Sequence, residues 1–384
     1  MTSPSLPIGP GSVIEERYRI LDILAVGGSG TVYRAIDGAT EEPVALKLMH
    51  AAHQEEDSER KRFLREAKIV SELEHDHIVP LLDWGHTDGG LPYLVFPLLE
   101  GRPLSKRLER HDPIDPIEAG ELAIQTLEAL EALHRRGIAH RDIKPANIFL
   151  EQTAQGETVR LLDFGLAKGG GGQANDVTRM GAVVGTPRYM APEQARGERV
   201  GPAADIYAMG LVLCEMVTGE PLVTSKADLE IYVAHGSDRA LKLPAAVAGT
   251  AFGPIVQRAI SKQPQARYRT ATQMLADVEA ATATLAAGDG GAGPAELEVT
   301  QRRRGTGSAL LSVPNETSER LRSVFNRLAA TAKDAAGAEW DDDPASSSDV
   351  PDDRPTIRQS VPQAQASLPI ALVRRIPPPE DEAD

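Results

Sequence analysis

Cysteine and long apolar runs are almost absent from the sequence. Cys214 is the single cysteine among 384 residues, which excludes an intramolecular disulfide and a cysteine-ligated metal cluster. No stretch approaches the roughly 18 consecutive apolar residues that a membrane-spanning helix needs. Residues 1–10 also lack the basic and apolar segments of a secretory signal. These absences predict a cytoplasmic protein without a membrane span.

Basic residues are outnumbered by acidic ones. The chain has 41 Lys and Arg against 56 Asp and Glu, which gives a formal net charge of −15 and a pI near 5.2. A chain with this charge is repelled by phosphate backbones and by anionic lipid headgroups. We therefore expect no nucleic-acid partner.

Aromatic residues make up only 4% of the chain, and beyond residue 287 they are reduced to Phe325 and Trp340. A glycine-rich break at 288–294 separates this part from the rest. Such a composition cannot bury enough apolar surface to offset its ordering entropy, so we predict a mostly disordered tail over 287–384. Apolar residues at helical spacing from Leu321 onward predict one amphipathic helix in it, at about 316–334.

Residues 18–286 begin with short β-branched segments and continue with a helical pattern. The pattern predicts strands at 18–24, 31–37, 43–49, 78–84 and 92–98, with a helix at 58–74. Asp115 followed by Pro116 and Glu118 is typical of a helix start. We expect an α+β fold with two lobes: a small strand-rich N-lobe (18–99) and a larger helical C-lobe (100–286), after an N-terminal extension (1–17). Ligands commonly bind between two such units.

A glycine-rich turn joins the first two predicted strands, in the run Ala25-Val26-Gly27-Gly28-Ser29-Gly30. Glycines permit positive φ and let backbone N–H groups approach a phosphate, but the same run also suits a plain hairpin turn. A strand follows, not a helix, so the run is not a dinucleotide-binding fingerprint, and the chain contains no G-x-x-x-x-G-K-[ST] motif. Taken alone, the turn leaves both interpretations open.

Lys47 and Glu66 are charged residues in apolar surroundings. Lys47 shares a strand face with Ala45, and Glu66 lies on the helix face that Phe63 and Val70 define. A carboxylate that points inward is costly unless it is paired. We predict that Glu66 pairs with Lys47 and that the ammonium group holds phosphate oxygens. The alternative is a solvated lysine on an exposed strand.

The most specific pattern is His140-Arg141-Asp142-Ile143-Lys144-Pro145-Ala146-Asn147, followed by Asp163-Phe164-Gly165. Asp142 can orient an acceptor hydroxyl and take its proton, and Lys144 can neutralise charge on a phosphoryl group in transfer. Asn147 and Asp163 offer the hard oxygen ligands that Mg²⁺ prefers. Each residue alone could be an ordinary loop residue. Their order and spacing together predict phosphoryl transfer.

With these motifs the chain resembles the Hanks-type (eukaryotic-like) serine/threonine protein kinases, and its bacterial members in particular. The resemblance covers roughly 18–286, about 70% of the chain, and is carried by AVGGSGTVYRA, VALK, Glu66, HRDIKPANIFL, DFG, GTPRYMAPEQ, DIYAMG and KQPQAR. It implies the kinase fold, ATP with Mg²⁺, and protein substrates with Ser or Thr acceptors. The implied roles are Asp142 as catalytic base, Lys144 as an aid to transfer, and Asn147 and Asp163 as metal ligands.

The resemblance also implies three long-range pairings. Lys47 contacts the α- and β-phosphates and pairs with Glu66. Glu193 pairs with Arg267. Asp205 anchors the catalytic loop from a buried helix.

The resemblance implies a nucleotide pocket formed by the N-lobe sheet and by the segment that joins the two lobes, the hinge. Phe96 lies at its back, the Pro97 carbonyl accepts from adenine N6, and the Leu99 N–H donates to N1. Thr186, together with Lys144, matches the Ser/Thr-specific pattern. The implied nucleotide-binding residues are Leu24, Ala25, Val26, Gly27, Gly28, Ser29, Gly30, Val32, Ala45, Lys47, Glu66, Pro97 and Leu99.

Two departures from the family pattern carry expectations of their own. Ala25 replaces the first glycine of the phosphate loop, so we expect a stiffer loop that still binds ATP. Met180 replaces one of two activation threonines, which leaves Thr178 as the expected autophosphorylation site. Thr306 or Ser308, behind Arg302–Arg304, is a second candidate site.

Two other functions fit parts of the pattern. A catalytically inactive kinase-like scaffold is one, although all four of Lys47, Asp142, Asn147 and Asp163 are present. A small-molecule kinase of the same broad fold is the other. The Ala-Pro-Glu run at 191–193 favours protein substrates over this alternative.

Overall fold

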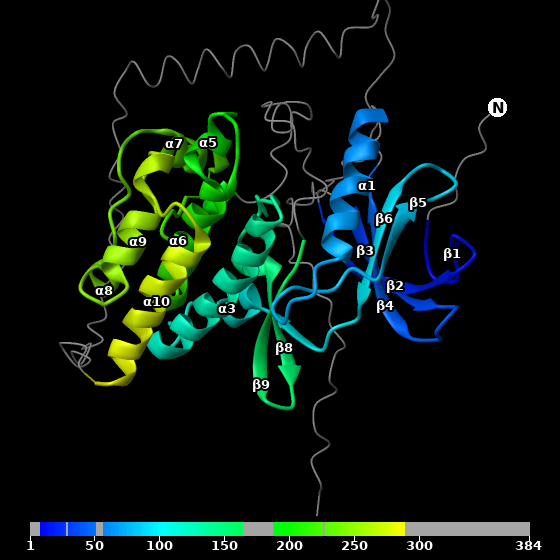
Figure 1. Ribbon diagram of the computed structural model, residues 1–384, viewed down its shortest axis with the longest axis horizontal. Helices are drawn as coiled ribbons and strands as arrows, with labels where there is room; N and C mark the ends of the chain where they lie inside the picture. The colour runs from blue at the N-terminus through cyan, green and yellow to red at the C-terminus, as the bar shows by residue number, and fades with distance from the viewer. Residues whose placement is uncertain (1–7, 28–29, 51–56, 164–186, 226, 289–384) are drawn as a thin grey trace, which may run out of the picture.

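The computed structural model describes residues 8–27, 30–50, 57–163, 187–225 and 227–288 (Figure 1). An N-lobe built on strands β1–β6 and helix α1 stands beside a C-lobe of helices and one small sheet. This is the two-lobed α+β architecture that the sequence predicts. The predictions on Gly28, Ser29, Thr178, Met180, Thr186, Thr306, Ser308 and the helix at 316–334 lie outside the described residues.

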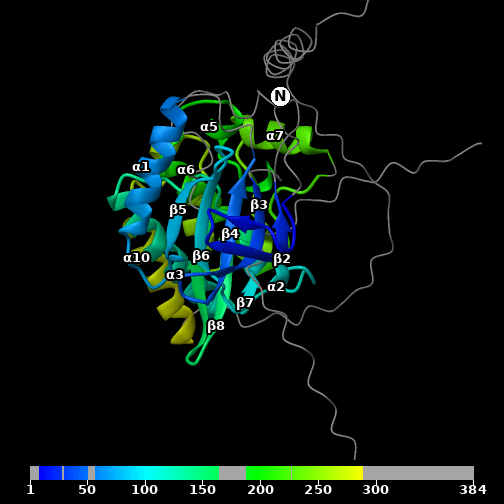
Figure 2. The same cartoon turned by 90° about the vertical axis from the view of Figure 1, so that its right-hand side faces the viewer.

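The N-lobe sheet is antiparallel, with strand order β1-β2-β3-β4-β6-β5. Figure 2 looks onto this sheet and shows α1 beside it. Phe63, Ala67 and Val70 form the buried face of α1, as predicted. The sheet also starts before the predicted N-lobe boundary, because β1 pairs with β2. The elements are β1 (Val13–Ile14), β2 (Tyr18–Val26), β3 (Gly30–Asp37), β4 (Pro43–Met49), α1 (Asp57–Ser71), β5 (Asp83–His86) and β6 (Pro92–Pro97).

The strand predicted at 78–84 is wrong for most of its length. β5 begins only at Asp83, and Ile78 forms a single isolated bridge with Leu161 of the C-lobe. Ile78 and Val79 are buried, so their apolar character reflects packing between the lobes and not sheet pairing. Pro80 contributes to this outcome because it has no N–H to donate to a strand ladder.

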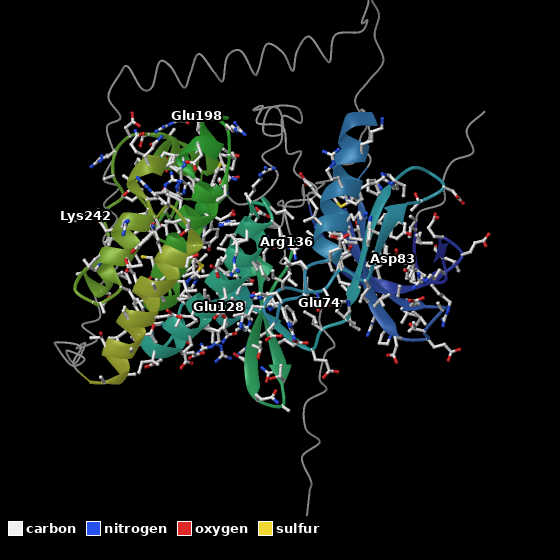
Figure 3. All side chains as sticks on the ribbon, in the orientation of Figure 1. Glu74, Asp83, Glu128, Arg136, Glu198 and Lys242 are labelled. Atoms are coloured by element: carbon white, nitrogen blue, oxygen red, sulfur yellow. The ribbon has the colours of Figure 1, made fainter. Side chains whose placement is uncertain are left out.

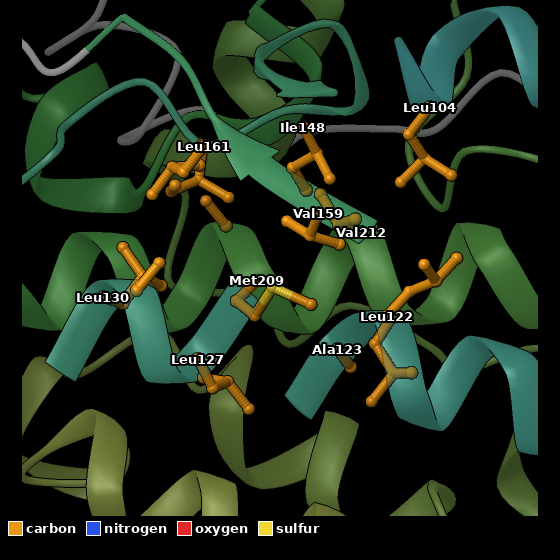
Figure 4. Packing of buried hydrophobic residues seen from close by; sticks show 14 of the residues in the cluster. Leu104, Leu122, Ala123, Leu127, Leu130, Ile148, Val159, Leu161, Met209 and Val212 are labelled. Atoms are coloured by element: carbon orange, nitrogen blue, oxygen red, sulfur yellow. The ribbon is translucent and has the colours of Figure 1, made fainter. Parts of the chain in front are cut away.

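The C-lobe core lies where α3, α6 and the β8–β9 hairpin meet. Leu122 and Leu130 of α3, Met209 of α6 and Val159 of β9 converge there (Figure 4). Asp115 caps α3 as predicted, since its carboxylate accepts from the N–H groups of Ile117 and Glu118. None of the described helices has the length and apolar character that crossing a bilayer requires. The C-lobe elements are β7 (Gly101–Pro103), α2 (Leu104–Arg107), α3 (Pro116–Arg135), η2 (Pro145–Asn147), β8 (Ile148–Thr153), β9 (Gly156–Leu161), η3 (Pro187–Tyr189), α5 (Pro192–Ala195), α6 (Pro202–Thr218), α7 (Asp228–Gly236), α8 (Ala245–Ala248), α9 (Gly253–Ala259), η4 (Pro264–Ala266) and α10 (Ala271–Ala286).

Candidate active site

One face of the N-lobe sheet carries the side chains expected around a nucleotide. Ala25 pairs with Val32, Val32 with Lys47, and Ala45 with Phe96 across neighbouring strands. Directly opposed residues of an antiparallel pair point to the same face, and Ala45 and Lys47 are two residues apart on one strand. All five are buried. The register therefore brings these predicted site residues together.

The glycine-rich turn has a structural reason for its last glycine. A Cβ at Gly30 would lie 2.4 Å from the Leu48 carbonyl oxygen, so β3 can approach β4 only with glycine here. The Gly27 N–H donates to the Gly30 carbonyl at 2.9 Å, which closes the turn. Leu24 is half-buried at the base of the turn, and Val26 is 59% exposed. Strands β2 and β3 thus pair as an antiparallel hairpin, and phosphate binding by the glycine-rich run stays a prediction.

Lys47 joins the two lobes through an ion pair with Asp163. The Lys47 ammonium group donates to Asp163 Oδ1 at 2.6 Å, with side-chain exposures of 6% and 13%. The sequence predicts Glu66 as the partner of Lys47; the ion pair that the structure gives Lys47 is with Asp163, the metal-ligand candidate. Glu66 is half-buried on α1.

The β8–β9 hairpin brings Asn147 next to Asp163. Asn147 ends the short helix η2 just before β8, and Asp163 follows β9 by two residues; the Leu162 N–H donates to the Asn147 carbonyl at 2.9 Å. The Asn147 amide nitrogen donates to the Asp142 backbone oxygen at 2.8 Å and to its carboxylate at 3.1 Å. Both contacts use the amide nitrogen, so the amide oxygen has no partner among the described residues and can bind a cation.

Lys144 lies against Asp142, with its ammonium nitrogen 2.9 Å from Asp142 Oδ2. Burial alone would lower the pKa of Lys144, but the carboxylates of Asp142 and Asp163 outweigh it and raise that pKa above its ordinary value. Lys144 therefore stays charged across the physiological range. The three predicted catalytic residues form one hydrogen-bonded group.

Asp205 anchors the catalytic loop from helix α6, as predicted. Its carboxylate accepts from the backbone N–H of His140 at 2.8 Å and of Arg141 at 2.7 Å, and from the His134 ring at 2.8 Å. Burial lowers the pKa of His140, so its ring is neutral and donates to the Leu162 carbonyl at 2.7 Å. This contact ties the loop to the chain just before Asp163.

Glu193 and Arg267 form the predicted pair, with two parallel hydrogen bonds of 2.7 Å each. Both residues are buried, at 4% and 2% exposure. Charged residues such as Glu198 and Lys242, by contrast, are exposed on the C-lobe surface (Figure 3). A buried bidentate pair fixes the orientation of α5 relative to the chain around Arg267.

The donor set fits Mg²⁺ bound together with phosphate oxygens. Mg²⁺ usually takes one or two protein oxygens and completes its shell with water and substrate phosphates. Asn147 and Asp163 supply such oxygens. Across the described ranges, no group of three or more His, Cys, Asp or Glu could form an all-protein metal cage.

The hinge residues lie where β6 ends. Pro97 pairs with Val44 at the edge of β4, and Leu99 is buried two residues later. Their hydrogen bonds to adenine stay predictions.

Gln194 is a residue that sequence reasoning missed: its side chain contacts the catalytic loop at the Arg141 carbonyl. The available signal was its place in the first turn of α5, where a Gln can reach backward.

Comparisons of the sequence with known proteins identify the family. Residues 18–277 match the family model for the protein kinase domain. Serine/threonine-protein kinase PknB of Mycobacterium tuberculosis is 35% identical over 283 residues, which cover 72% of this chain and 44% of PknB. The DNA damage-responsive serine/threonine-protein kinase RqkA of Deinococcus radiodurans is 39% identical over 232 residues, covering 60% of this chain and 34% of RqkA.

Solved structures agree on the fold. The kinase domain of M. tuberculosis PknI, in a double mutant, superimposes with a TM-score of 0.58 at 22% identity, covering 72% of this chain and 100% of that domain. Two lobes with an interlobe Lys–Asp pair and the HRD and DFG sequences define a protein kinase fold. The chain belongs to the protein kinase family, within the Hanks-type serine/threonine kinases of bacterial type. It spans less than half the length of PknB.

Proposed function

We propose that this protein is a serine/threonine protein kinase that transfers the γ-phosphoryl group of ATP to Ser or Thr hydroxyls of proteins. One observation carries the proposal: Lys47 from the N-lobe meets Asp163 at 2.6 Å, beside the hydrogen-bonded group of Asp142, Lys144 and Asn147. Phosphoryl transfer depends on positioning and charge stabilisation, and these residues supply both.

In the proposed reaction, Asp142 orients the acceptor hydroxyl and receives its proton. The hydroxyl oxygen forms a bond to the γ-phosphorus while the bond from that phosphorus to the β–γ bridging oxygen breaks, and ADP leaves. Lys144 stabilises the negative charge on the phosphoryl oxygens during transfer. Because Lys144 is held by Asp142, one contact aligns both groups.

Asn147 and Asp163 hold Mg²⁺, which when bound neutralises charge on the triphosphate. Lys47 binds the α- and β-phosphates, and Glu66 on α1 helps to position them. The turn from Ala25 to Gly30 covers the phosphates. Val32, Ala45 and the hinge residues Pro97 and Leu99 hold the adenine. Autophosphorylation at Thr178 and the cytoplasmic location are further predictions from the sequence.

The test is phosphate transfer by the purified full chain with ATP and Mg²⁺, with phosphosites mapped by mass spectrometry. Lys47→Ala and Asp163→Ala should each lower transfer by about 100-fold or more, because each removes charge from the phosphate and metal site. Circular dichroism and thermal melting would show that both variants stay folded, and Asp142→Asn gives the background.

Near-normal transfer by folded Asp163→Ala would contradict the assigned roles. Nucleotide binding without any transfer by the unaltered chain would instead support the inactive scaffold. Transfer only to small molecules, with protein acceptors unmodified, would support the small-molecule kinase.

A further inference from the structure

The side chain of Gln194 accepts one hydrogen bond and donates another. Its Oε1 accepts from the Ala191 backbone N–H at 2.9 Å, and its Nε2 donates to the Arg141 carbonyl at 2.9 Å. A backbone N–H can only donate and a carbonyl can only accept, so a single orientation of the amide satisfies both contacts. The side chain therefore links the start of α5 to the catalytic loop.

The Arg141 peptide is a position that needs such support. Arg141 has a positive φ of 63°, which is strained for a residue other than glycine. Backbone in this region is strained and persists only where its surroundings hold it. The Arg141 N–H donates a hydrogen bond to the Asp205 carboxylate at 2.7 Å, and the Arg141 carbonyl accepts one from Gln194. That carbonyl belongs to the peptide bond between Arg141 and Asp142.

The helix that presents Gln194 is itself fixed. The neighbouring Glu193 is held by the bidentate, buried Arg267, whose guanidinium group also donates to the backbone oxygens of Ala203 and Ser261. The Ala191 residue at the N-terminus of α5 is fully buried. Gln194 thus extends from a rigid support toward the strained loop.

We propose that Gln194 is a positioning residue for the catalytic carboxylate: it holds the Arg141–Asp142 peptide and so couples the end of the Ala-Pro-Glu run to Asp142. The inference deepens the proposed function and rests on it for its kinetic part. Its structural part, the order of the catalytic loop, does not depend on activity.

Gln194→Glu separates this role from a purely structural one. A glutamate at the third helical position also accepts from the backbone N–H at the helix start and caps the helix as well as glutamine does. An ionised carboxylate, however, cannot donate to the Arg141 carbonyl and repels it. If Gln194 only capped α5, Gln194→Glu would behave like the unaltered protein. Two further variants are compared with it: Gln194→Met, which loses both contacts, and Gln125→Met, a control at another glutamine.

Gln125 is the matched control. It is a half-buried glutamine whose Oε1 accepts from a backbone N–H, that of Val159, at 2.8 Å, and it makes no hydrogen bond to the catalytic loop within the described residues. Gln125→Met reports the cost of losing one such bond elsewhere in the lobe.

We expect the full chain with Gln194→Glu to keep its melting temperature and its KM for ATP while kcat falls by about tenfold. The kcat of this variant relative to the unaltered protein should rise as the pH falls, because a protonated carboxyl regains a donor. Amide exchange in residues 138–147, measured by mass spectrometry, should accelerate in both Gln194 variants and not in Gln125→Met.

Unchanged kcat and unchanged loop exchange in Gln194→Glu would overturn the inference. If the unaltered chain transfers no phosphate, the proposed function fails, and the exchange measurement alone decides whether Gln194 holds the loop.

Discussion

His235 is a buried residue whose protonation opposes folding. Its Nδ1 accepts from the Tyr207 hydroxyl at 2.9 Å, and its Nε2–H donates to the Arg188 carbonyl at 3.0 Å. Burial, reinforced by the nearby charge of Lys262, lowers the pKa of His235 to about 4. The unfolded chain, with a histidine pKa of about 6.5, binds this proton more readily, so stability is lost as the pH falls from about 6.5 toward 4.

We therefore predict that His235→Gln flattens the pH dependence of the free energy of unfolding. Urea unfolding at pH 7 and pH 5 should show a smaller loss in this variant than in the unaltered protein, by at most about 2 kcal/mol. The exposed His111, changed to Gln, is the control. An identical loss in His235→Gln and the unaltered protein would contradict the prediction.

Single residues differ in how far the sequence specifies their partners. The Glu193–Arg267 pair and the anchoring role of Asp205 followed from the family resemblance and are confirmed. Lys47 was expected to pair with Glu66, but it pairs with Asp163. The approach of Asp163 to Lys47 depends on how the two lobes meet, which no local pattern encodes.

Helices α3 and α10 pack closely at Gly120. A Cβ on Gly120 of α3 would lie 2.1 Å from Thr282 Oγ1 on α10 and 3.1 Å from the Phe252 ring. Alanine in place of a helical glycine gains about 1 kcal/mol in helix propensity, but overpacking costs about 1–3 kcal/mol and here meets buried atoms on two sides. We predict that Gly120→Ala lowers the midpoint of urea unfolding.

Adding Thr282→Ala should recover most of that loss, because it removes the two atoms that lie closest to the new methyl group. Gly236→Ala in α7 is the control, since its Cβ would find Ala195 at an ordinary 3.6 Å. Equal effects of Gly120→Ala and Gly236→Ala would show that the α3–α10 contact does not require glycine.

Elements were predicted best where local chemistry decides them. Strands β2, β3, β4 and β6 and the capped start of α3 follow from alternation, turns and a capping carboxylate. The sequence wrongly predicts a strand at 78–82, because a buried connector between lobes has the same apolar composition as a buried strand. The contact of Gln194 with the catalytic loop was missed because it depends on the approach of α5 to that loop.

At the scale of the whole molecule, the described lobes end at Gly288 and the tail still carries Thr306 and Ser308. The eighteen residues from Asp289 to Thr306 can span at most about 65 Å, against a radius of gyration of about 18 Å for a compact domain of the length of residues 18–286. Hydroxyl groups on such a tether can reach the active site of their own chain at high effective concentration. The acidic chain also attracts the neighbouring Arg302–Arg304.

We therefore predict autophosphorylation at Thr306 or Ser308 within one chain, so that the fractional rate stays constant over a tenfold dilution of the enzyme. A chain that ends after Ala287 should lose this incorporation and differ from the full chain in specific activity or assembly. Full-length Asp142→Asn, added as a substrate, should be modified by the active protein much more slowly than the active protein modifies itself. Equal rates, or a rate that falls with dilution, would mean transfer between chains. A truncated chain that matches the full one in activity, assembly and partner binding would mean that the tail is only a linker.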